Sequence, residues 1–122
     1  MVGAAITSGG FNLMFKRLYG DAGVPEISVV KFGAGTTTPA IGDTAMESSV
    51  QSNSIQSVAY DTTDNKVTVR SLLTLSQGNG YTISECGEFN ASSVMVSHDV
   101  FTGISKTSSE EIVLVVVHQL TA

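Results

Sequence analysis

Tryptophan is absent from this chain, cysteine occurs once, and basic residues are scarce. A lone cysteine excludes an internal disulfide and a cysteine-based zinc site. Six Lys and Arg residues stand against eleven Asp and Glu residues, which leaves a net charge of −5. This balance argues against a phosphate-binding surface, because nucleic-acid affinity comes mainly from clusters of basic side chains. We therefore expect no nucleic-acid partner.

Long apolar segments are also lacking. The longest apolar run, residues 112–117, is far too short to cross a bilayer, so no membrane partner is expected. The opening stretch MVGAAITSGG has neither the positively charged region nor the long apolar core of a secretory signal. We expect a soluble protein that is made in a reducing cytoplasm.

Glycine, serine and threonine are plentiful, whereas strong helix formers are few. That composition favours a mainly β protein with many turns. A length of 122 residues indicates a single domain spanning residues 1–122, which is long enough to bury a core without disulfides.

One segment has helical periodicity. In SGGFNLMFKRLYG, the apolar residues Phe11, Met14, Phe15 and Leu18 recur at helical spacing, which predicts a helix over about residues 11–19 that stops at Gly20. A stripe of this kind is more often core than a partner-binding face. The alternative is that it docks on an adjacent subunit.

The rest of the chain predicts strands and turns. ISVVKF (27–32) is a short strand, residues of about 33–50 form a long polar loop, and strands follow from about 53 to 120. In KVTVRSLLTLS, apolar and polar residues alternate, as in a half-buried strand. The pattern predicts a β-sandwich, or one antiparallel meander covered by the short N-terminal helix.

The last strand, EIVLVVVHQL, is apolar on both faces. Val113, Val115 and Val117 share one face, and His118 shares the other with Ile112, Leu114 and Val116. Both faces should therefore be covered, by a second sheet or by a neighbouring subunit.

The stretch ISECGEF holds two glutamates that invite a functional explanation. If QGNG (77–80) closes a hairpin, Gly87 lies opposite Arg70, and Arg70 becomes a diagonal neighbour of Glu85. We interpret this pair as a structural or interface ion pair. Catalysis by two carboxylates is disfavoured, because Glu85 and Glu88 are three apart on a strand and point to opposite faces.

Other candidate sites have weaker patterns, and for each a structural role is the simpler interpretation. A free cysteine such as Cys86 usually behaves as a small hydrophobe, and neither His98 nor His118 has a ligand cluster around it. GAGTTTPA lacks the lysine of a phosphate loop. Asp61, Asp64 and Asn65 fit turn chemistry without calcium. We expect no catalytic residue, no cofactor and no bound metal.

Taken in order, several segments resemble the tail-collar or tail-fibre type structural proteins of tailed bacteriophages. A T-x-x-G stretch and short helix appear as ITSGGFNLMFKRL. A strand then runs into the loop FGAGTTTPAIGDTAME, and a later strand reads ISECGEF. A lysine-containing link and an apolar strand, ISKTSSEEIVLVVVHQL, end the pattern. Glu88 stands where that family usually has leucine, and Cys86 where it usually has an aliphatic residue.

The resemblance implies a non-enzymatic virion protein, made in the host cytoplasm and assembled as a homo-oligomer, with a trimer favoured, in contact with other virion proteins. Collar, fibre-base, adaptor and capsid-decoration positions are all compatible with it. A β-sandwich module that binds carbohydrate or a host surface is the alternative, and a small enzyme ranks last. The residues that we expect at structural or subunit contacts are Arg70, Glu85, Gly87, Phe11, Phe15, Leu18, Val113, Val115 and Val117.

Overall fold

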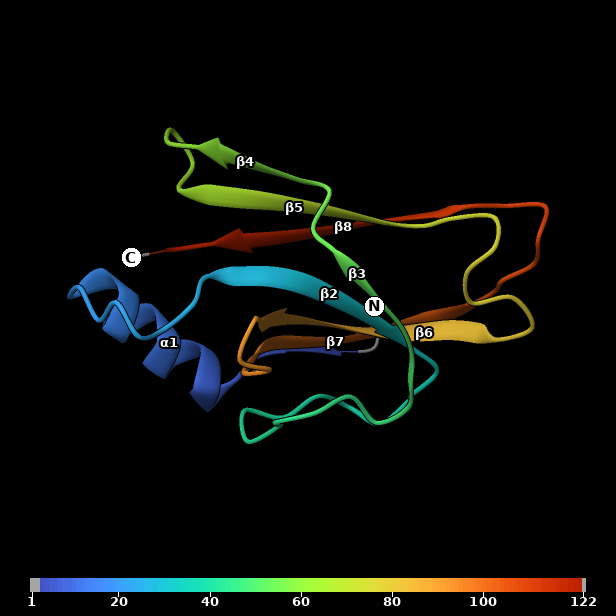
Figure 1. Cartoon of the computed structure of the whole chain (residues 1–122), viewed down its shortest axis with the longest axis horizontal. Coiled ribbons are helices and arrows are strands. Elements are labelled where there is room, and N and C mark those ends of the chain that lie inside the picture. Colours follow the sequence, from blue (N-terminus) through green and yellow to red (C-terminus); the bar gives the residue numbers. More distant parts are fainter. Residues whose placement is uncertain (1–2, 122) are drawn as a thin grey trace.

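The chain folds into two antiparallel sheets and one short helix, so it is mainly β with a sandwich-like arrangement. The structure is a computed structural model and describes residues 3–121. The larger sheet has the order β1-β7-β6-β2-β3 and the smaller one the order β4-β5-β8. Figure 1 shows the smaller sheet layered over the larger one, with α1 at the end of the molecule where β8 ends.

Every neighbouring pair of strands is antiparallel. The elements are β1 (Gly3–Ile6), α1 (Ser8–Leu18), β2 (Ile27–Gly33), β3 (Ser49–Ser54), β4 (Ser57–Asp61), β5 (Lys66–Leu73), β6 (Thr82–Asn90), β7 (Met95–Ser105) and β8 (Ile112–Gln119).

The hydrophobic core lies between the two sheets. Alternation along β5 buries Val69 and Leu73, as the sequence pattern predicts. Cys86 lies among these apolar side chains and is 2% exposed. The core residues are Val30, Phe32, Val69, Leu73, Ile83, Cys86, Ile112 and Val116. The free cysteine therefore packs as a small hydrophobe.

α1 begins earlier than the sequence pattern indicates, because Thr7 caps it. The Thr7 hydroxyl oxygen accepts a hydrogen bond from Gly10 N at 3.0 Å, and the hydroxyl donates to Met95 O on β7. At the other end, Gly20 has a left-handed φ of 84°, the expected conformation for a residue that stops a helix.

The interpretation of the apolar stripe of α1 as core is wrong. The helix presents Gly10 and Leu13 to the sheet instead, and a Cβ on Gly10 would collide with the backbone oxygen of Val96. This close approach turns the stripe outward, which leaves Phe11 and Phe15 exposed and Leu18 77% exposed. No helix within residues 3–121 is both long and apolar enough to span a membrane.

The predicted hairpin between β5 and β6 does not form. β5 pairs with β4 and β8, whereas β6 pairs with β2 and β7. The segment after β5 instead carries the chain from one sheet to the other, with Gly78 and Gly80 at left-handed φ values of 67° and 85°. The QGNG stretch therefore encodes a turn, but the turn joins two layers rather than two neighbouring strands.

Candidate functional site

β6 presents its two glutamates to opposite faces of the larger sheet, as the spacing predicts, and each contacts a histidine. Glu85 lies under the loop that joins β2 to β3, where it is fully buried and contacts His98. Glu88 lies between the two sheets, where it is 1% exposed and contacts His118. Buried carboxylates require partners, and each of these two glutamates has its own set.

The Glu85 carboxylate binds the loop between β2 and β3 through backbone N–H groups. Its Oε1 accepts from Gly35 N at 3.1 Å and Ser48 N at 3.0 Å, and its Oε2 accepts from Glu47 N at 2.7 Å. His98 Nε2 lies 2.6 Å from the same Oε2. One side chain thus ties both ends of the loop to β6 and β7.

His98 links this carboxylate to a second one. Its Nδ1 lies 2.7 Å from Asp43 Oδ2 in the middle of the loop, while its Nε2 contacts Glu85. Both ring nitrogens must donate to satisfy two carboxylates, and only the protonated imidazolium has two N–H groups. We refer to Glu85, His98 and Asp43 as the loop clamp.

The electrostatics of the loop clamp agree with this protonation state. Burial alone would raise the pKa of Glu85, but hydrogen bonds from the Glu47 and Ser48 backbone and from His98 outweigh it, so the pKa is lowered. Burial alone would lower the pKa of His98, but Asp43 and Glu85 outweigh it, so that pKa is raised. The Ala40 N–H, followed by His98, lowers the pKa of Asp43.

The predicted ion pair between Arg70 and Glu85 is wrong. Arg70 is exposed on β5 in the smaller sheet, opposite Ser57 and Val115, whereas Glu85 belongs to the larger sheet. The error follows from the hairpin that does not form. Gly87 lies opposite Lys31 and His98, so it does not face Arg70 either.

A buried lysine stabilises the crossings between the two sheets, and sequence reasoning missed it. Lys106 is 1% exposed, and its Nζ donates to Asn79 Oδ1 at 2.9 Å and to Thr107 O at 2.8 Å. Its backbone also bonds to Gly80 and Tyr81. The QGNG turn and the link after β7 are therefore joined, which a single lysine in a polar stretch does not indicate.

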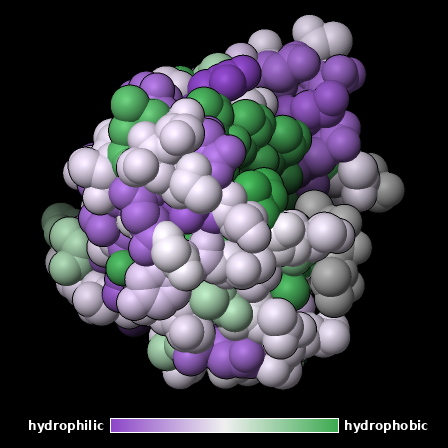
Figure 2. Space-filling model, turned by 90° about the vertical axis from the view of Figure 1, so that its right-hand side faces the viewer, coloured by the Kyte–Doolittle hydropathy of each residue, from purple (hydrophilic) through white to green (hydrophobic). Residues whose placement is uncertain are grey.

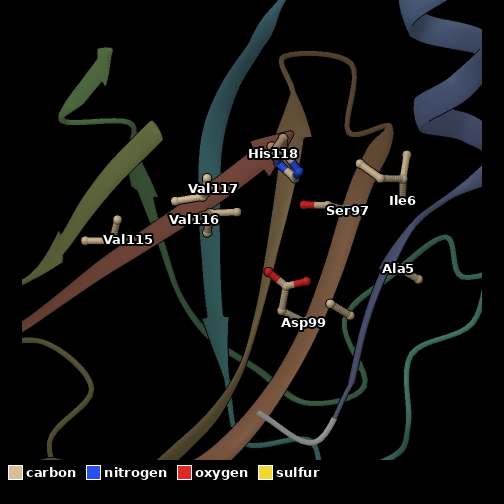
Figure 3. A pocket seen from close by; sticks show the side chains of 9 residues that line it. Ala5, Ile6, Ser97, Asp99, Val115, Val116, Val117 and His118 are labelled. Atoms are coloured by element: carbon tan, nitrogen blue, oxygen red, sulfur yellow. The ribbon is translucent and has the colours of Figure 1, made fainter. Parts of the chain in front are cut away.

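The second glutamate, Glu88, forms a cluster with His118 and Ser97 at a place where the smaller sheet leaves part of β7 uncovered. Glu88 Oε1 accepts from His118 Nε2 at 2.5 Å and from the Ser97 hydroxyl at 3.1 Å. Glu88 Oε2 is buried and has no hydrogen-bond partner within the described residues. Figure 3 shows Ser97, Asp99 and His118 around one groove, with Ala5 and Ile6 of β1 on its other side.

This groove has a volume of about 220 Å³ and a floor that is polar for an intersheet space. The Glu88 hydrogen bond raises the pKa of His118, and burial raises the pKa of Asp99. The Ser97 hydroxyl donates to a carboxylate and not to a histidine. Since the histidine is not positioned as its base, this arrangement differs from a Ser–His–acid triad. Its hydrogen bonds instead fix β6, β7 and β8 to one another.

A larger and mostly apolar groove lies between α1 and the β4–β5 turn. Its volume is about 420 Å³, and Met14, Tyr60 and Leu120 line it. His118 lines both this groove and the smaller one. The predicted turn chemistry of Asp61 is confirmed, because its Oδ1 accepts from Thr63 N and Asp64 N.

The outward face of β8 is apolar and exposed. Val113, Val115 and Val117 are 54%, 45% and 52% exposed, whereas Ile112 and Val116 are buried against the other sheet. Figure 2 shows a strongly apolar patch, bordered by hydrophilic side chains, in the upper half of the molecule, where Figure 1 places the smaller sheet. Within residues 3–121, only the inward face of β8 is covered.

In the part of the chain that the structure describes, the remaining chemistry-bearing residues form no further cluster. Burial raises the pKa of the Cys86 thiol, and its Sγ faces Asp99 at 3.9 Å rather than a histidine. Within residues 3–121, no group of three or more His, Cys, Asp and Glu side chains is arranged to hold a metal ion. No family model, no curated protein and no solved structure matches the chain.

Proposed function

We propose that this protein is a non-enzymatic structural subunit of a tailed-phage virion, which assembles with copies of itself and with other virion proteins. The observation that carries the proposal is the outward row of exposed valines on β8. Apolar patches of this kind on a small domain usually mark protein contacts. The phage setting comes from the resemblance of the sequence segments.

The contacts of those segments support the resemblance with a physical reason. Glu85 of ISECGEF binds backbone groups at both ends of the loop FGAGTTTPAIGDTAME. Cβ atoms on Gly33 or Gly35 would collide with Glu85 Oε1. The stretch ITSGGF also reaches this loop, since Ser8 N donates to Ile41 O. Segments far apart in the sequence thus depend on one another in the fold.

The exposed side of α1 is a second apolar surface that supports assembly. Phe11, Phe15 and Leu18 point away from the sheet, and no described part of the chain covers them. A virion subunit that contacts its own copies and a different neighbour requires at least two surfaces. In this proposal β8 and α1 provide them. The resemblance implies a trimer, whereas the geometry of the β8 edge points to a pair of copies, and the mass of the assembly in solution distinguishes the two.

The test is the composition of purified particles from the cells that encode the chain. Mass spectrometry of density-banded virions should detect the protein at a fixed number of copies per particle. Recovery with tail-less capsids would assign a decoration role, whereas recovery with isolated tails would assign a collar, adaptor or fibre-base role. Absence from intact particles, with the protein present in the lysate, would contradict the proposal.

A carbohydrate- or host-surface-binding module is the second candidate. It is favoured by Tyr60, which is exposed and lines the 420 Å³ groove beside Asp61 and Asn65. An aromatic face next to polar side chains is a common sugar platform. A glycan array would support this candidate if binding were specific and were lost in Tyr60→Ala but kept in Tyr19→Ala.

A further inference from the structure

The exposed valines of β8 are also the residues with free backbone groups. Among the strands within residues 3–121, β8 pairs with β5 alone, so one of its edges is free. Leu120 N donates to Asn65 O beside β5, and backbone groups alternate in direction along a strand. The N–H and C=O groups of Val113, Val115 and Val117 therefore point to the free edge, and their side chains point outward.

This edge has none of the features that usually prevent strand pairing. Natural edges are blocked by charged residues, proline, bulges or a covering loop. Residues 112–117 contain no charge, proline or glycine, and the pairing with β5 has no register shift. The strand runs for eight residues and is rich in β-branched side chains. It is a ready template for another strand.

We propose that β8 pairs antiparallel with β8 of a second copy, about a two-fold axis at Val115, to form a continuous six-stranded sheet. In this register Val115 faces Val115 of the other copy, and Val113 faces Val117. Valine therefore meets valine along the whole outward row, and β-branched cross-strand pairs are favourable. The inference rests on the proposed function, and it names the surface through which two copies of the subunit contact each other.

Charge favours the antiparallel direction. Glu111 of one copy lies opposite Gln119 of the other, and Gln119 has Lys66 as its neighbour on β5. Glu111 of one copy thus meets a neutral side chain and lies near Lys66, which also contacts Asp64 of its own chain. A parallel pair would instead place Glu110 and Glu111 beside the same residues of the second copy, and like charges directly opposite are destabilising.

The groove under the free edge provides room for the second strand. It lies between β8 and the strands β1 and β7, and the small side chains of Ala4 and Ala5 help to form it (Figure 3). The inward residues of the incoming strand stay covered by their own copy, since Ile112 and Val116 are buried within each chain. A two-fold contact is self-complementary, so both copies bury the same surface.

The first test is the mass in solution by size-exclusion chromatography with light scattering. Because small interfaces tend to be weak, the series should reach about 300 μM. The wild-type chain is expected at twice its 12.7 kDa mass, and Val115→Lys at the mass of one chain. Leu75→Lys is the matched control, since Leu75 lies in a turn and is 50% exposed, close to the 45% of Val115.

The second test is disulfide trapping, which checks the register. The Cα atoms of directly opposed residues lie about 4.5–5.5 Å apart, within disulfide range. Val115→Cys is expected to cross-link to itself under mild oxidation. Val113→Cys and Val117→Cys should cross-link when mixed, but each far less when alone. Cys86 is buried and should leave the wild-type chain uncross-linked.

A monomer at all concentrations, or an assembly whose mass Val115→Lys leaves unchanged, would overturn the inference. So would a trimer formed head-to-tail, in which β8 meets another edge such as β4. These outcomes are separate from the fate of the proposed function. If the chain is present in virions but Val115→Lys does not change its mass in solution, only the β8 contact is refuted. If the β8 dimer forms but the chain is absent from virions, only the virion role is refuted.

Discussion

Glu85 and His98 are joined by a 2.6 Å contact between Oε2 and Nε2, on the face of the larger sheet that the loop between β2 and β3 covers. Both side chains are almost fully buried, and Asp43 occupies the other ring nitrogen at 2.7 Å. The contact links two central strands to the loop between β2 and β3. The stability of that loop should therefore depend on the Glu85 carboxylate and on the protonation of His98.

Removal of the Glu85 carboxylate should release the loop. Glu85→Ala leaves three backbone donors and the buried His98 without their acceptor, and loss of one member of a buried pair typically costs about 3–5 kcal/mol. Urea unfolding should show this loss, and hydrogen exchange should show faster exchange at Gly35, Glu47 and Ser48. Glu26→Gln is the control, because Glu26 is exposed. Unchanged protection at these amides would contradict the role of Glu85.

The loop clamp should stabilise the fold most in a mildly acidic window. The raised pKa of His98 means that its contribution is complete below its unfolded pKa of about 6.5 and is lost as pH rises through the folded pKa. The lowered pKa values of Glu85 and Asp43 mean that theirs is complete above about pH 4.5 and is lost as pH falls.

Melting temperature should accordingly be highest between these limits. Thermal unfolding across pH is the measurement. His98→Gln should flatten part of the alkaline decline, and the double variant with His118→Gln should flatten more of it, because the pKa of His118 is also raised. A melting temperature that rises steadily from pH 5 to pH 8 would contradict this assignment.

Gly35, the second glycine of the GAG stretch, should be intolerant of a side chain. A Cβ at residue 35 would lie 2.6 Å from Glu85 Oε1, so Gly35→Ala must displace the carboxylate or the loop. Overpacking of this kind typically costs about 1–3 kcal/mol. Gly42→Ala is the matched control in the same loop, since no atom lies within 4 Å of its added Cβ. Equal unfolding free energies for the two variants would contradict the proposed collision.

The Cys86 thiol should be inert in the folded protein. It is 2% exposed, and burial raises its pKa, so little thiolate forms at neutral pH. A chromogenic disulfide reagent should react with the chain only after it unfolds in denaturant. Rapid reaction under native conditions would show that the core around Cys86 opens readily.

Much of the fold could be predicted from local patterns, because alternation and helical spacing depend on near neighbours. The buried face of β5, the strand at 27–33 and the stop at Gly20 follow from such patterns. The pairing of β5 with β8 does not, because the hairpin at QGNG and a crossing turn have the same local sequence. The error in pairing then produced the wrong partner for Glu85.

The outward stripe of α1 shows a second limit. Helical spacing identifies the apolar face but not its direction, and Gly10 allowed another face to approach β7. Two histidine–carboxylate contacts were also out of reach, since His98 and Asp43 are 55 residues apart in sequence and His118 and Glu88 are 30 apart. By contrast, the exposure of Val113, Val115 and Val117 is compatible with the predicted need for a neighbour at β8.

A density map of the intact virion in which this chain is traced would test the virion role and the β8 contact together. We expect the chain to be present and a β-strand of a second copy to lie along the free edge of β8, with Val115 near the two-fold axis. A particle that lacks the chain, or one in which the β8 edge faces solvent, would contradict this expectation.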